Sequence, residues 1–87
     1  MHLVHIVLTH PDLPQPSSAD AERVLDILWA HVDHRSGIEH IRTRPGPGAV
    51  DLGLFFSGDG SHGASHAAAA LAGLLAALPG WAATAPR

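Results

Sequence analysis

The stretch from Ala49 to Leu78 constrains the fold more than any other part of this chain. It opens with apolar residues at every second position from Val50 to Phe56, a period typical of a strand with one face in a core. Glycines and small polar residues at 57–61 then favour a sharp turn. Ser61 stands where it can cap a following helix. The stretch therefore predicts a buried strand, a turn and a helix in direct succession.

That helix carries a stripe of leucines padded elsewhere with alanine, the residue with the highest helix propensity. Leucines at i, i+3, i+4 and i+7 share one face of a helix, so we expect this stripe to cover the apolar face of the strand. We expect the helix to end at Pro79 and Gly80, with Gly80 as its C-terminal cap. The stripe consists of Leu71, Leu74, Leu75 and Leu78.

The order of elements predicts the fold class. The other elements that we expect are a strand at 3–9, a helix capped by Ser17 or Ser18, a weaker strand at 38–44 and, at the C-terminus, either a short edge strand at 81–85 or a flexible tail at 82–87. The order β-α-β-β-α, with or without a final strand, is that of the split β-α-β, or ferredoxin-like, arrangement. We therefore predict one α+β domain over residues 1–87, with two helices on one face of an antiparallel sheet.

In this topology the first and third strands are central, and the sheet face away from the helices is open. The weaker strand adds either His40 and Arg42 or Glu39 and Ile41 to that face, and the sequence leaves the choice undecided. Apolar residues on an open face are rarely left exposed in a monomer, which predicts a homodimer. The open face should carry Leu3, His5 and Val7 from the first strand and Asp51, Gly53 and Phe55 from the third.

Composition excludes several classes of function. The 87 residues include no cysteine, which rules out disulfides and thiolate metal sites. A formal charge of −3 without any lysine argues against a nucleic-acid partner. The first ten residues lack the pattern of a secretory signal, and no segment is a convincing membrane span. We expect a cytoplasmic protein with no membrane partner and no cofactor.

Residues 58–63 read GDGSHG and match G-x-G-x-x-G. Such a turn can present backbone amides to an anion. A dinucleotide site is disfavoured because the turn follows the third strand, and because Asp59 would repel phosphate. We therefore keep Ser61 as a helix cap and as a candidate ligand-binding residue, and we do not interpret it as a nucleophile.

The chain contains eight histidines, and their full protonation would change the formal charge from −3 to +5. Two pairs have helical spacing, His31 with His34 and His62 with His66. A strong metal site needs three or four ligands, and neither pair has the intervening glutamate of a metalloprotease motif. We therefore assign no metal site.

His5 is the histidine that most suggests chemistry, because it lies in mid-strand among apolar residues. Asp51 of the adjacent strand could orient it as a general base. Arg42 or His40 would then hold an anionic group of the substrate, beside Phe55. The alternative is a histidine that only fills a subunit interface, and the sequence favours this alternative.

Three hypotheses for function follow. The first is a non-catalytic dimeric domain that binds a partner protein or a small ligand through the open face. The second is a small dimeric-barrel biosynthetic enzyme that acts on an apolar metabolite or peptide, with His5 as the base. The third is a histidine-based sensor of metal or pH. The fold alone does not decide among them.

Overall fold

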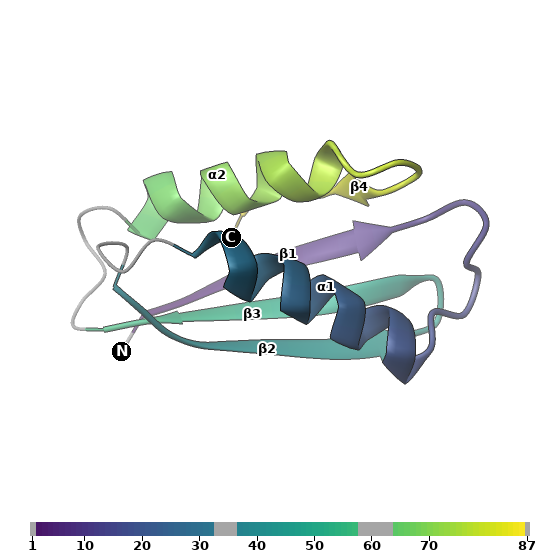
Figure 1. Cartoon of the computed structure of the whole chain (residues 1–87), viewed down its shortest axis with the longest axis horizontal. Coiled ribbons are helices and arrows are strands. Elements are labelled where there is room, and N and C mark those ends of the chain that lie inside the picture. The colour runs from purple at the N-terminus through teal and green to yellow at the C-terminus, as the bar shows by residue number, and fades with distance from the viewer. Residues whose placement is uncertain (1, 33–36, 58–63, 87) are drawn as a thin grey trace.

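The structure is a computed structural model, and it describes residues 2–32, 37–57 and 64–86 (Figure 1). A four-stranded antiparallel sheet has the strand order β2-β3-β1-β4, which confirms the predicted ferredoxin-like α+β fold and its central first and third strands. The elements, in chain order, are β1 (His2–Thr9), α1 (Ser18–His31), β2 (Ile38–Gly46), β3 (Ala49–Phe56), α2 (Ala64–Ala76) and β4 (Ala82–Ala83).

The core lies between the sheet and the two helices, and its buried residues are all apolar in the described part of the chain. Alternation along the two central strands produces it, because every second side chain points to the same face. α1 packs mainly over β2, and α2 packs over β1 and β4. The strands supply Val4, Ile6, Leu8, Ile41, Val50, Leu52, Leu54 and Phe56, and the helices supply Ala21, Val24, Leu28, Ala68, Leu71 and Leu75.

A capping box starts α1. The Ser17 N–H donates to the Asp20 carboxylate at 2.8 Å, and the Asp20 N–H donates to the Ser17 hydroxyl at 3.2 Å. These bonds satisfy donors that the helix itself cannot satisfy. The bonds from the Ser17 backbone and then from its hydroxyl lower the pKa of Asp20 below its ordinary value. Of the two predicted caps, Ser17 is therefore the one that caps the helix, and Ser18 is the first helical residue.

α2 ends earlier than its sequence predicts. The Ala77 N–H donates to both Gly73 O and Leu74 O, so the last turn tightens, and the helix stops at Ala76. Gly80 lies in the turn beyond it, with a φ of +82°. A Cβ at Gly80 would overlap the ring of His10, so this glycine makes room for a side chain rather than capping the helix.

The C-terminal end of the described chain forms the fourth strand, so the strand alternative for this segment is correct. Ala82 and Ala83 pair with the end of β1. Thr84 extends the pairing, since its N–H donates to Val7 O and its hydroxyl accepts from the Val7 N–H, both at 2.9 Å. No helix in the described ranges combines the length and apolar character needed to cross a membrane.

β2 is an edge strand with an irregular start. Ile38 pairs with Phe56, yet His40, two residues on, pairs with Phe55. A β-bulge therefore absorbs one residue at Glu39. The bulge turns Ile41 into the core, where its side chain is 2% exposed. Of the two alternatives that the sequence left undecided, His40 and Arg42 therefore lie on the open face. β2 also continues two residues past the predicted end.

Candidate functional site

The open face, opposite the helices, is a grid of three rows that run across β1, β3 and β2. Strand register sets each row, because directly paired residues lie side by side on one face. Successive rows are two residues apart along a strand, roughly 7 Å. The apolar row is Leu3, Phe55 and His40; the central row is His5, Gly53 and Arg42; the polar row is Val7, Asp51 and Arg44.

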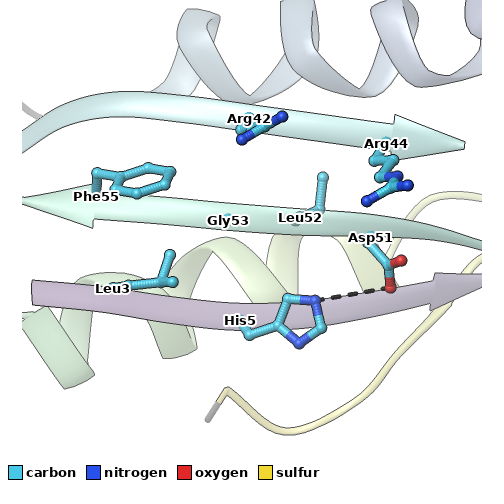
Figure 2. A pocket seen from close by; sticks show the side chains of 8 residues that line it. All are labelled: Leu3, His5, Arg42, Arg44, Asp51, Leu52, Gly53 and Phe55. Atoms are coloured by element: carbon cyan, nitrogen blue, oxygen red, sulfur yellow. Dashed lines mark ion pairs between the residues drawn. The ribbon is translucent and has the colours of Figure 1, made fainter.

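A hollow of about 340 Å³ lies over the middle of this grid (Figure 2). Its volume is at the lower end of the range of about 300–1,000 Å³ that is usual for small-molecule sites. We call it the open-face hollow. Its lining consists of Leu3, His5, Arg42, Arg44, Asp51, Leu52, Gly53 and Phe55.

The structure brings His5 and Asp51 together as diagonal neighbours on β1 and β3 (Figure 2). The His5 Nε2 and the Asp51 Oδ1 lie 3.6 Å apart, and each side chain is about half exposed. This separation is longer than a hydrogen bond. The contact becomes an ion pair when the imidazole is protonated, and both residues line the hollow.

Arg42 and Arg44 stand next to each other on the open face of β2, and both are exposed. Neither guanidinium forms an ion pair with any residue in the described ranges. Asp51 lies in the same row as Arg44 but makes its ionic contact with His5. Two arginines without a protein anion at a hollow form a local positive site on a chain of negative formal charge.

Arg44 is a residue of the hollow that the sequence had not predicted, although its signal was present. Arg44 follows Arg42 by two residues, and side chains two apart in a strand share a face. With the strand expected to end at residue 44, its pairing could not be assigned. The actual end at Gly46 places Arg44 well inside β2, opposite Asp51.

Phe55 lines the hollow on the side away from the charges, and His40 packs against it. Their ring centroids lie 5.6 Å apart with an interplanar angle of 46°, a geometry common for packed aromatic rings. Phe55 is half-buried and His40 is exposed. His40 therefore packs against the Phe55 ring and is not among the residues that line the hollow.

Gly53 forms the floor at the centre of the grid. A Cβ built on it would lie 3.3 Å from the Phe55 ring and 3.4 Å from Leu3 Cδ1. Glycine in a strand interior often marks a place where another group comes close to the backbone. A side chain at this position would stand against Leu3 and Phe55 and reduce the depth of the hollow.

Ser61, the other candidate from the sequence, lies outside the described residues, as do the rest of 58–63 and His34. His31 and His66 are exposed, and the His31 Nδ1 lies 2.8 Å from Ile27 O in its own helix. Among the described residues, no three histidines or acids come together in a group that could hold a metal ion.

Comparison of the chain with protein-family models, with curated proteins and with solved structures finds no match. The function therefore has to be inferred from the open face itself.

Proposed function

We propose that the protein is a non-catalytic binding domain that takes a small anionic molecule in the open-face hollow. The observation that supports this is the pair Arg42 and Arg44, which has no ionic partner in the described chain at the rim of a ligand-sized hollow. Guanidinium groups recognise carboxylates and phosphates through two parallel hydrogen bonds. An anion would give these two side chains the partner that no described residue provides.

We propose further that the domain works as a homodimer whose open faces meet. Leu3 is 54% exposed on this face beside the half-buried Phe55, and the half-buried Val7 lies two rows away on the same strand. Contact between two such faces removes apolar surface from water, at roughly 25 cal/mol per Å². Such a contact also takes arginines out of water, which is costly unless they are paired. A bound anion would neutralise them, so the two proposals are compatible.

Nuclear magnetic resonance titration with acetate tests the binding proposal. We expect the amide signals of Arg42, Gly53 and Arg44 to shift together, with weak affinity. Arg42→Gln should weaken binding about tenfold, since it removes a charged hydrogen-bonding partner. Arg23→Gln is the matched control, because it removes the same charge from an exposed position on α1. Equal weakening in both variants would mean that acetate senses only the overall charge and would refute the site.

Sedimentation velocity tests the dimer. Leu3→Asp puts a charge on the open face at an exposed position, so we expect a folded monomer. Trp29→Asp is the control, since Trp29 is the other large apolar residue that is clearly exposed in the described chain, at 43%, and lies on α1. An unchanged assembly in Leu3→Asp, or dissociation in Trp29→Asp alone, would place the interface elsewhere.

One observation favours a second candidate, an enzyme that uses His5 as a general base. His5 lines the hollow and its Nε2 lies 3.6 Å from Asp51 (Figure 2), so that Asp51 could hold this side of the ring while Nδ1, the other ring nitrogen, takes the proton. Phenylpyruvate in D₂O is a suitable probe, because the protons next to its keto group exchange when a base removes them. If this candidate is correct, the wild type exchanges these protons faster than buffer alone does, and Asp51→Asn exchanges them more slowly than the wild type. Undiminished exchange with His5→Gln would exclude it.

A further inference from the structure

We infer that the ligand of the open-face hollow is a carboxylate with a flat apolar body, and that Gly53 is the residue that selects for that body. This inference rests on the proposed function and adds the chemical class of the ligand. It follows from the way in which the three rows divide the hollow into an apolar side, a floor and a charged side.

The apolar side can accept a flat group. Leu3 and Phe55 are direct cross-strand partners, and both come close to the point where a Gly53 Cβ would lie, at 3.4 and 3.3 Å. These distances are near or inside ordinary carbon contacts. A flat group can lie on the bare backbone at Gly53 with its edge against both side chains. A side chain at position 53 would lift it away from that floor.

The charged side suits one negative charge rather than two. Arg42 lies directly beside Gly53, and Arg44 lies one row further, roughly 7 Å along the strands. Asp51 is in the row of Arg44 and contributes a negative charge. With His5 and His40 neutral, the two arginines and Asp51 sum to +1. A monoanionic carboxylate balances this charge. A dianionic phosphate would leave one negative charge unbalanced, and this charge would be repelled by Asp51.

The two sides lie close enough for one small molecule to reach both. The apolar row and the Arg42 row are adjacent, about 7 Å apart, so a ring that lies against Leu3 and Phe55 can carry its carboxylate to Arg42. His5, in the same row as Arg42, then borders the ligand on the opposite side. The ligand class is therefore an aryl carboxylate.

A series of ligands tests this inference by calorimetry. Acetate, benzoate and 2-naphthoate keep the same head and enlarge the flat body. We expect affinity to rise about tenfold from acetate to naphthoate, because partial burial of the rings removes apolar surface from water. 2-Naphthalenemethanol, which has the body without the charge, should bind at least about tenfold more weakly than naphthoate. 2-Naphthyl phosphate should bind no more tightly than naphthoate.

Gly53→Ala provides the variant. The added methyl group needs shifts of only a few tenths of an ångström in Leu3 and Phe55, so we expect a folded protein with about tenfold weaker binding of naphthoate and unchanged binding of acetate. Gly73→Ala is the matched control. Gly73 lies on α2, away from the hollow, and a Cβ at this position meets nothing within 4 Å. This variant should bind both ligands as the wild type does.

The outcomes separate this inference from the proposed function. If acetate and naphthoate both fail to bind, or if Arg42→Gln leaves their binding unchanged, the proposed anion site is wrong and the ligand class is wrong with it. If acetate binds through Arg42 but naphthoate binds no more tightly than acetate, or if Gly53→Ala weakens the binding of the two ligands equally, the anion site stands. The proposal that Gly53 selects for a flat apolar body is then refuted. Tighter binding of the phosphate would overturn the assignment of a carboxylate.

Discussion

Leu75 and its neighbour Leu74 allow a quantitative test of the packing between α2 and the sheet. Both belong to the leucine stripe, but their environments differ. Leu75 has no exposed surface, whereas Leu74 is only partly buried at the border of the core. Leu75→Ala and Leu74→Ala remove the same atoms from adjacent positions of one helix, so the chemistry is matched and burial is the variable.

The expected cost follows from the atoms that are lost. Leucine to alanine removes three carbon groups, worth about 0.8 kcal/mol each when fully buried, and the cavity left behind adds to this. We therefore expect Leu75→Ala to lower the free energy of unfolding by about 3–4 kcal/mol. A domain of 87 residues has a total stability of about 4–13 kcal/mol. The loss is thus a large share of the whole.

Leu74→Ala should cost about half as much or less, because part of its side chain already contacts water. Thermal unfolding followed by circular dichroism measures both. For a domain of this size, 1 kcal/mol corresponds to a shift in Tm of about 4–8 °C, so Leu75→Ala should melt at least about 12 °C below the wild type. Equal melting of the two variants, or a larger effect at Leu74, would show that α2 is rotated about its axis relative to this packing.

Three further predictions concern local contacts. Gly80→Ala should lower stability more than Gly48→Ala in urea unfolding, because both glycines have a positive φ but only Gly80 would overlap a side chain, that of His10; equal losses would contradict this contact. Ser17→Ala should cost about 1 kcal/mol through the lost cap and raise the pKa of Asp20, measured by carboxyl NMR. Since that pKa is lowered in the folded protein, its stabilising effect is present above about pH 4 and should fade as the pH falls further; a wild type and a Ser17→Ala variant with parallel acid unfolding curves would refute it. Thr84→Val should expose the Val7 amide to faster hydrogen exchange, because the hydroxyl that accepts its N–H is removed; unchanged protection would argue against the β4 pairing.

Sequence patterns predicted the central part of the fold because its determinants are local. Alternation over Val50–Phe56 specifies which face is buried whatever surrounds the strand, and the cap at Ser17 depends on a residue three positions away. The places of His5 and Gly53 on the open face followed from these features, and so did the proximity of His5 and Asp51, whereas the place of Arg42 did not.

The remaining features depend on contacts between distant residues. The bulge at Glu39 arises from how β2 pairs with β3, and the neighbouring residues do not predict the change of register. The end of α2 at Ala76 precedes the Pro-Gly stop signal, since residues 77–81 make turns that position Trp81 against His10, 5.1 Å between ring centroids. Arg44 was missed for a related reason, because β2 continues through Pro45, which an edge strand tolerates.

The bulge and the proline of β2 also govern how copies of this chain can associate. An edge strand with regular free amides offers a template on which a strand of another molecule can pair. β2 interrupts that template twice, at Glu39 by the bulge and at Pro45 by a residue without an N–H. Growth of the sheet beyond β2 into a continuous ribbon is therefore disfavoured. Chains that meet at high concentration, during synthesis or folding, are thereby protected on this side from open-ended aggregation.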